Sequence, residues 1–101
     1  MLILQRSNYQ WHIFYLEDVI MDDFIGAIRL FPWDFDTAGW LKCKGQSLPV
    51  QQNSALFALL GVKFGGDGQR TFMLPNLPDI KTETGTISYY IATQGIFPER
   101  D

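Results

Sequence analysis

A cluster of glycines in the middle of the chain has the composition of a phosphate-binding loop. Gly61, Gly65, Gly66 and Gly68 fall within the stretch LFALLGVKFGGDGQRTFMLPNL. A nucleotide loop leads from a strand into a helix, so that backbone N–H groups and the helix N-terminus face the anion. Here the order is reversed, because the glycines follow a helical pattern and precede an extended one. We therefore expect them to permit positive φ angles in a tight loop, with Asp67 bonding the loop backbone.

Two other groups of residues carry side chains suited to catalysis. Asp34 and Asp36 point the same way in an extended chain, as the carboxylate pair of a glycosidase would, but a solvated turn also accounts for them and is the interpretation we favour. Cys43 stands between Lys42 and Lys44, whose charges would lower the pKa of its thiol and favour a reactive thiolate. The alternative for this cysteine is a buried structural role.

The histidine and cysteine counts limit enzymes and metal sites. His12 is the only histidine and Cys43 the only cysteine. After residue 21 no histidine is available as the base of a Ser/His/Asp or Cys/His arrangement. One copy of the chain can form neither a disulfide nor a Cys/His zinc site. We therefore expect no enzymatic activity, no metal and no cofactor.

Composition and charge argue against other classes of protein. The 101 residues have a formal net charge of −3, and the Lys and Arg residues are scattered, without the basic stripe of a nucleic-acid-binding protein. The apolar runs fall short of the ~20 residues of a membrane-spanning helix, and the first residues lack the basic-then-apolar order of a secretory signal. Aromatic residues make up 15% of the chain and charged residues 19%. So much apolar surface in one small domain predicts association with other chains.

The character of the sequence changes at Met21. Residues 1–20 mix aromatic and aliphatic side chains without a clean period, and WHIFYLEDVI fits one strand or one and a half helical turns. A second methionine then opens a much better patterned segment. We expect residues 1–20 to be a leader that arises from a mis-assigned start, and residues 21–101 to form one domain.

Three strands and one helix are expected to position the residues above. Residues 24–31 alternate as a strand that Pro32 ends, and residues 39–45 form a second strand with Trp40 on its solvent side. Residues 86–97 alternate as an edge strand with one face on the core. About residues 51–61 form the helix, with Gly61 at its C-terminal end. Leu56, Phe57 and Leu60 make its apolar stripe, which predicts an α+β domain: a small β-rich unit with one helix packed on short antiparallel strands.

Four segments of the chain follow one another in a characteristic order: FIGAIRLF, GWLKCKGQSLPV, QQNSALFALLG and FGGDGQRTFMLPNL. This series resembles the phage tail collar domain, which is found in tail fibre proteins and in the bacterial microcystin-dependent proteins. The resemblance covers residues 21 to about 77, and the closing YYIATQGIFPERD resembles the ending of the bacterial family. The positions that match the family pattern are Gly39, Trp40, Cys43, Gly45, Leu48, Ala55, Leu56, Phe57, Leu60, Gly61, Gly65, Gly66, Asp67, Gly68, Thr71, Phe72, Leu74, Pro75 and Leu77.

The resemblance implies a structural or attachment component of a phage tail fibre, or of a related prophage-derived appendage. Such a component associates with itself, with a trimer favoured, and with other tail proteins, and is located in the virion tail or an extracellular appendage after a cytoplasmic stage. The family pattern also implies a buried, structural Cys43. The alternative function is a free-standing module that binds a carbohydrate or another surface ligand. Trp40 and Tyr90 are the expected exposed contact residues.

The chain departs from longer family members after Leu77. Those members continue with an Arg-Gly-Arg stretch and a substantial insertion, which in tail fibres carries the receptor-facing part. This chain has PDIKTETGT instead and reaches its last strand almost at once. The resemblance therefore supports assembly into a fibre more strongly than it supports recognition of a receptor.

Overall fold

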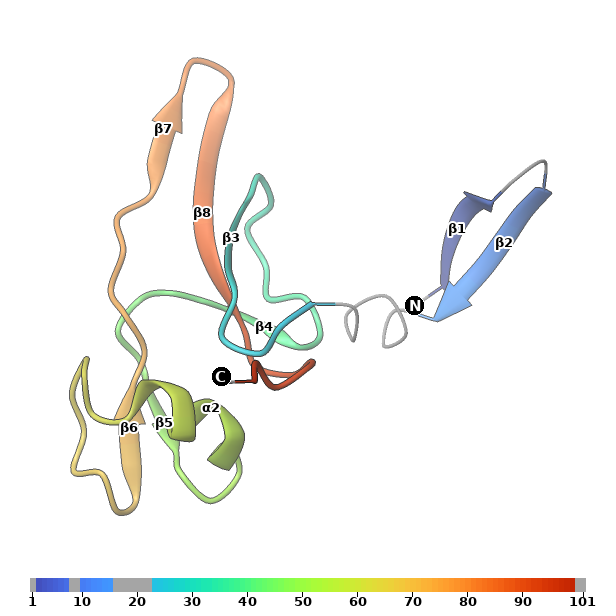
Figure 1. Cartoon of the computed structure of the whole chain (residues 1–101). Coiled ribbons are helices and arrows are strands. Elements are labelled where there is room, and N and C mark those ends of the chain that lie inside the picture. The colour runs from blue at the N-terminus through green and yellow to red at the C-terminus, as the bar shows by residue number, and fades with distance from the viewer. Residues whose placement is uncertain (1, 8–9, 16–22, 100–101) are drawn as a thin grey trace.

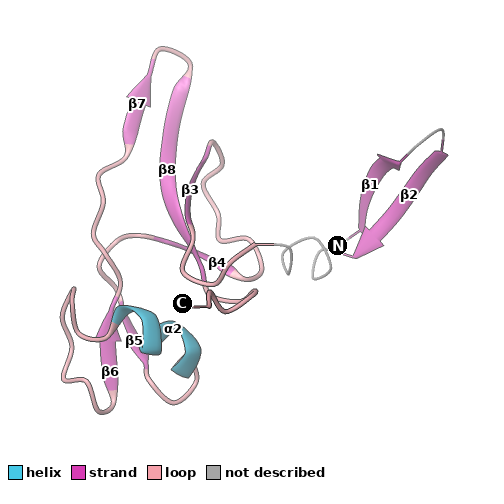
Figure 2. Cartoon of the chain, viewed as in Figure 1, coloured by secondary structure: helices cyan, strands magenta, loops and turns pink. Residues whose placement is uncertain are grey.

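The computed structural model describes residues 2–7, 10–15 and 23–99 (Figure 1). Within these ranges the regular elements are strands, except for one short helix, α2, at Ser54–Leu60 (Figure 2). Every pairing between named strands is antiparallel. The expected α+β class, a small β-rich domain with one short helix, is therefore confirmed.

The first two strands form a hairpin of their own. β1, Leu2–Ser7, pairs with β2, Gln10–Tyr15, along the full length of both. From the sequence, the segment that begins at Trp11 could be either a strand or a helix. The part of that segment within β2 is a strand. Residues 16–20 lie outside the described residues, and a start at Met21 stays a prediction.

A second sheet is built around the last strand, β8, at Gly85–Ala92. Its order is β3-β8-β4, with β3 at Ile28–Phe31 and β4 at Trp40–Lys42, and β7, Ile80–Thr82, pairs with the first residues of β8. The expectation that the last strand lies at an edge is wrong. β3 pairs with Ser88–Ile91 on one edge of β8 and β4 pairs with Tyr90–Ala92 on the other, so β8 occupies the centre of the sheet.

The chain turns before β3, where the sequence predicted four further residues of strand. Gly26 has a φ of 86°, and the N–H of Ala27 donates a 3.1 Å hydrogen bond to the C=O of Phe24. A four-residue turn with positive φ at its third position is the type II geometry that glycine favours. The strand therefore begins only at Ile28, and it ends before Pro32 as expected.

The helix connects the two strands of a small ladder. β5, Ser47–Pro49, and β6, Thr71–Met73, pair antiparallel, with α2 and the glycine-rich loop between them. The helix is shorter than the expected residues 51–61, but its end is as expected. Gly61 has a φ of 55°, and its N–H donates to the C=O of Phe57 at 2.7 Å.

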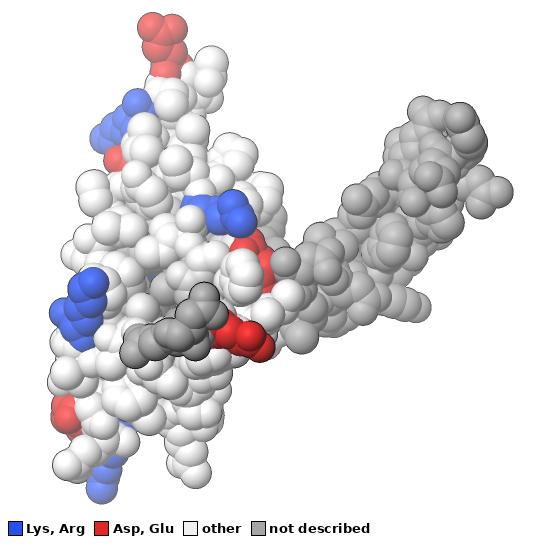
Figure 3. Space-filling view, in the orientation of Figure 1, with Lys and Arg blue, Asp and Glu red and all other residues white. Residues whose placement is uncertain are grey.

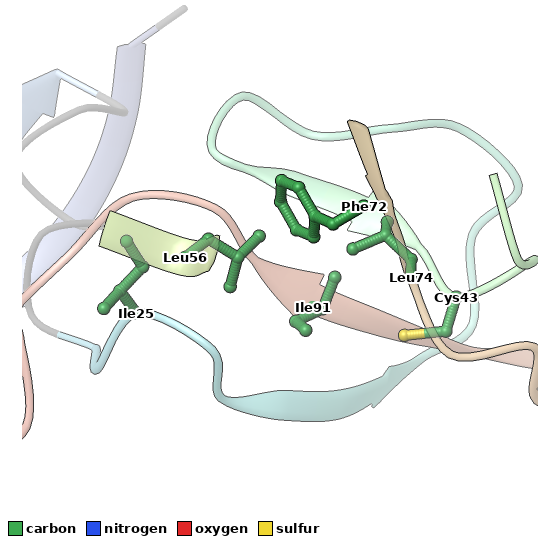
Figure 4. Packing of buried hydrophobic residues seen from close by; sticks show 6 residues of the cluster. All are labelled: Ile25, Cys43, Leu56, Phe72, Leu74 and Ile91. Atoms are coloured by element: carbon green, nitrogen blue, oxygen red, sulfur yellow. The ribbon is translucent and has the colours of Figure 1, made fainter. Parts of the chain in front are cut away.

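One apolar cluster joins the helix, the ladder and the larger sheet. Its buried members come from five segments of the chain and meet as Figure 4 shows: Ile25, Cys43, Leu56, Phe72, Leu74 and Ile91. The expected helix stripe packs here, since Leu56 is buried and Phe57 and Leu60 lie partly buried against the cluster. The core therefore sits between α2 with its ladder and one face of the β3-β8-β4 sheet.

Candidate functional site

The positions of the collar pattern fall into two groups in the fold. One group surrounds β4, and its members are Gly39, Trp40, Cys43 and Gly45. The other runs from β5 and α2 through the glycine loop to the residues after β6, and its members are Leu48, Ala55, Leu56, Phe57, Leu60, Gly61, Gly65, Gly66, Asp67, Gly68, Thr71, Phe72, Leu74, Pro75 and Leu77. Backbone hydrogen bonds join the groups, because the N–H of Gly45 donates to the C=O of Pro75 at 3.1 Å and that of Leu77 to the C=O of Cys43 at 2.9 Å. Any functional role for these positions stays a prediction.

The glycine loop lies directly against β6. The N–H of Met73 donates a 3.1 Å hydrogen bond to the C=O of Gly65. A Cβ atom on Gly65 would lie 2.7 Å from the Sδ of Met73, and one on Gly66 only 2.5 Å from the Cα of Phe72. Both glycines have positive φ, at 125° and 98°. Glycine is needed here because the loop backbone approaches β6 too closely for any side chain.

Asp67 holds the same loop from within. Its Oδ1 accepts hydrogen bonds from the backbone N–H groups of Gln69, Arg70 and Thr71 at 2.9, 2.8 and 3.0 Å. These three donors favour the ionised carboxyl and lower the pKa of Asp67 to about 2. The expected bonding of Asp67 to the loop backbone is confirmed. The N–H groups that a phosphate would require at this point are already bound to a carboxylate of the loop itself.

Cys43 is buried in the core cluster. Burial raises the pKa of its thiol to about 11, with the charge of Lys44 acting weakly in the opposite direction. Both neighbouring lysines are paired elsewhere, since the Nζ of Lys42 pairs with the carboxylate of Asp34 and the Nζ of Lys44 with Asp79 Oδ1 at 2.7 Å. A thiol with a raised pKa and no access to solvent is not an activated nucleophile.

The two aspartates considered as a carboxylate pair converge on one lysine. Asp34 pairs with the Nζ of Lys42, and the Oδ1 of Asp36 accepts a 3.1 Å hydrogen bond from the backbone N–H of Lys42. The side-chain hydrogen bond to Asp34 raises the pKa of Lys42. The pair therefore ties the loop after β3 to β4.

Trp40 and Tyr90 are not exposed, so the prediction that they are surface contact residues is wrong. Both are buried in a second apolar cluster on the face of the sheet opposite the core, together with Ala92. Phe31 and Trp33 cover this face, because the chain folds back over it after β3. Alternation along the strand identified the correct face but not the loop that covers it.

A column of aromatic rings extends from this second cluster to the surface. The rings of Phe31 and Trp33 stack with centroids 4.5 Å apart and planes 11° apart, and those of Trp33 and Phe35 with centroids 5.9 Å apart and planes 23° apart. Phe35 is 62% exposed and forms the outer end of the column. The hydroxyl of Tyr90 donates to the C=O of Trp33 at 2.8 Å, which fixes the middle of the column.

Other large apolar side chains lie at the surface, and sequence reasoning named only part of them. From the sequence, a single copy was expected not to hide all of Trp33, Phe35, Trp40, Phe64, Tyr89, Tyr90 and Phe97. Of these, Phe35, Phe64 and Phe97 are exposed, whereas Trp40 and Tyr90 are buried. Phe24 and Ile96 are also exposed, but the alternating pattern had placed both within strands. Two turn-forming glycines could have indicated that these residues lie outside the strands. Gly26 follows Phe24, and Gly95 directly precedes Ile96.

Charges and metal-binding groups give no second candidate site in the part of the chain that the structure describes. On the face drawn in Figure 3, Lys and Arg lie singly among uncharged residues and not in a continuous stripe. Among the described residues no three His, Cys, Asp or Glu side chains are grouped so that they could hold a metal ion. No helix within these ranges is long and apolar enough to cross a membrane.

The family model of the phage tail collar domain matches residues 26–80, which is more than half of the chain. The chain belongs to the phage tail collar domain family. This is a structural family of phage tail fibres, so the collar chain is placed among structural components of the virion tail. Neither the curated proteins nor the solved structures gave a significant match.

The collar match begins at the turn before β3 and ends at the first residue of β7. It therefore includes β4, the helix and the glycine loop, but not β8, the strand that all the others in its sheet pair with. The resemblance noted for the closing residues lies outside the matched range. The collar domain of this chain needs residues beyond 80 to complete its sheet.

Proposed function

We propose that this collar chain is a non-enzymatic structural and attachment component of a phage tail fibre, or of a related prophage-derived appendage, and that it assembles through self-association. The observation that carries the proposal is the family match, together with a glycine loop whose N–H groups donate to the carboxylate of Asp67. The exposed apolar side chains support association, because a contiguous apolar patch often marks a protein–protein contact. A trimer is the favoured assembly, and other tail proteins are the further partners.

The mass of the full chain in solution tests this function. Gel filtration with light scattering over a range of protein concentrations should give a mass three times that of the single chain. Immunogold labelling of particles from the source phage or prophage should place the protein on the tail. A chain that stays monomeric at every concentration, and that is absent from purified particles, contradicts the proposal.

A second function, a module that binds a surface carbohydrate, rests on the ring column that ends at Phe35. The ring of Phe35 has one face stacked on Trp33 and is largely exposed. An exposed aromatic face can pack against the apolar face of a sugar ring. Titration with a panel of oligosaccharides, followed by tryptophan fluorescence, should then show saturable binding that Phe35→Ser abolishes.

The expected domain boundary at residue 21 remains a proposal of its own. The intact mass of the protein isolated from its natural source decides it. A mass that corresponds to residues 21–101 supports a mis-assigned start, and a mass that includes residues 1–20 overturns it.

A further inference from the structure

Four exposed apolar side chains from three segments of the chain gather on one surface. Phe24 forms an isolated bridge with Ile96, so the residues before β3 lie beside the C-terminal segment. Leu59 of α2 and Phe97 line one hollow, which brings the helix to the same place (Figure 1). We call Phe24, Leu59, Ile96 and Phe97 the terminal patch.

The terminal patch has the size of the apolar patches that often serve a function on a protein surface. Phe24, Ile96 and Phe97 are 54%, 51% and 49% exposed, and Leu59 is 37% exposed. An aromatic side chain presents roughly 200 Å2, so the four together leave on the order of 400 Å2 of apolar surface in water. A typical monomer has a largest patch of roughly 300–600 Å2, and such a patch is often functional.

The patch contains a projection and a hollow next to each other. The hollow has a volume of about 500 Å3 and is lined by Ala58, Leu59, Phe97, Pro98 and Glu99. Phe24 projects beside it, bridged to the residue that precedes Phe97. A hollow of this volume is in the range that holds a small molecule, so it can take one phenyl ring.

A projection and a hollow on one surface make that surface complementary to itself. In a closed ring of three copies, the projection of each copy can enter the hollow of the next, and the same contact repeats around the axis. Around the patch, the ion pair of Arg29 Nε with Asp23 Oδ2 at 2.6 Å and the carboxylate of Glu99 supply charged groups. An apolar centre with a polar rim is the usual anatomy of a protein interface.

The apolar area of the terminal patch is large enough to form the centre of a contact with other copies of the chain. Three patches brought together around one axis bury on the order of 1,200 Å2 of apolar surface, and the polar rim adds to it, which reaches the roughly 1,200–2,000 Å2 of a standard interface. Among the residues whose burial is described, the two buried clusters hold nine apolar side chains. Association would remove further apolar surface from water and stabilise the folded chain.

We propose that the terminal patch is the surface through which one copy of this chain docks on another, with Phe24 of one copy seated in the hollow beside Leu59 of its neighbour. The inference rests on the self-association put forward as part of the proposed function. It adds which surface makes the contact and which side chains meet there.

Exchange of Phe24 for a small polar residue tests the patch in the full chain. Phe24→Ser should weaken self-association about tenfold or more, because a central aromatic side chain carries much of the energy of an interface. Phe35→Ser is the matched control, since it removes an exposed phenylalanine from a different surface and should leave association unchanged. Sedimentation velocity over a concentration series gives the association constants, and near-ultraviolet circular dichroism checks that both variants keep the fold.

Disulfide trapping between two single variants tests the pairing itself. Phe24→Cys and Leu59→Cys are purified separately and mixed under mild oxidation, and peptide mass spectrometry is used to find a disulfide between positions 24 and 59 of different chains. The native Cys43 is buried and stays out of the reaction. Glu83→Cys, in the turn between β7 and β8, replaces Leu59→Cys in the control mixture and should give no such link.

The outcomes separate the patch from the proposed function. If the wild-type chain associates but Phe24→Ser associates equally well and no disulfide joins positions 24 and 59, the terminal patch is not the contact surface, and the proposed self-association stands. If the wild-type chain is a monomer at all concentrations, both the proposed contact surface and the proposed self-association are wrong. Loss of association in Phe24→Ser with a retained fold, together with the 24-to-59 disulfide, establishes the patch as the contact.

Discussion

A Cβ atom on Gly66 would lie 2.5 Å from the Cα of Phe72. The same atom would lie 2.7 Å from the carbonyl oxygen of Thr71, so the obstacle is backbone and not a side chain that could move aside. Gly66 also has a φ of 98°, which L-residues rarely adopt. The loop and β6 are therefore joined at a point where only glycine fits.

Gly66→Ala should destabilise the domain by about 3 kcal/mol or more, because backbone strain and a steric clash add together. Gly61→Ala is the matched control. Gly61 also has positive φ, at 55°, but a Cβ there meets nothing within 4 Å. The loss of stability in Gly61→Ala should be limited to the backbone strain of its φ of 55° and ψ of −141°, about 1–3 kcal/mol. Urea denaturation of both variants measures the difference, and equal losses would show that the close approach to β6 does not matter.

The carboxylate of Asp67 should make the stability of the domain depend on pH in acid. Three backbone donors hold its pKa at about 2 in the folded state, whereas an aspartate in an unfolded chain titrates at about 3.9. Above about pH 5 the group is ionised in both states and its contribution is nearly complete. As the pH falls from about 5 to about 2, through both pKa values, the unfolded chain takes up the proton first, so this contribution is lost.

Asp67→Asn removes the charge but keeps an oxygen that can accept hydrogen bonds. Thermal unfolding measured between pH 2 and pH 5 should therefore show a flatter dependence for Asp67→Asn than for the wild-type chain. Glu83→Gln, in the turn between β7 and β8 at the opposite end of the domain in Figure 1, serves as the control. If Asp67→Asn follows the wild-type curve throughout this range, the three hydrogen bonds do not set the acid response.

The sequence predicted those parts of the fold that depend on neighbouring residues. The end of the helix at Gly61 and the bonding of Asp67 to its own loop are local, because each involves residues within four positions of each other. The turn at Gly26 is also local but was missed. Alternation of apolar residues across it looked like a strand, and the positive φ that glycine permits decided the outcome.

The parts that the sequence did not predict depend on contacts between distant segments. Alternation placed Tyr90 and Trp40 on the face away from the core, but it could not show that the loop with Trp33 folds over that face. The terminal patch was missed for the same reason. Phe24 and Ile96 come from opposite ends of the domain, and only their bridge brings them to one surface.

The thiol of Cys43 should react slowly in the folded protein. The side chain is buried, and burial raises its pKa to about 11, so both access and the thiolate fraction are low at neutral pH. A coloured thiol reagent at pH 8 should label it orders of magnitude more slowly than in 6 M guanidinium, where an unfolded cysteine titrates at about 8.5. Ser47→Cys provides an exposed thiol for comparison. Equally fast labelling of the two cysteines under native conditions would contradict the buried role.

The hydroxyl of Tyr90 links the centre of the sheet to the loop that covers it. It donates a 2.8 Å hydrogen bond to the C=O of Trp33, 57 residues earlier in the chain. Tyr90→Phe keeps the ring and removes only this bond, so the free energy of unfolding should fall by about 1 kcal/mol.

Tyr89→Phe is the matched control for this exchange, because Tyr89 lies on the opposite face of the same strand and packs partly buried against the core. Its effect should be smaller, and the tryptophan signals in near-ultraviolet circular dichroism should change only for Tyr90→Phe, since only that exchange frees the loop with Trp33. A loss of stability without a change in those signals would mean that the hydroxyl stabilises the sheet without holding the loop. An equal loss of unfolding free energy in both variants would mean that the hydrogen bond to Trp33 contributes no more to stability than the hydroxyl of Tyr89 does.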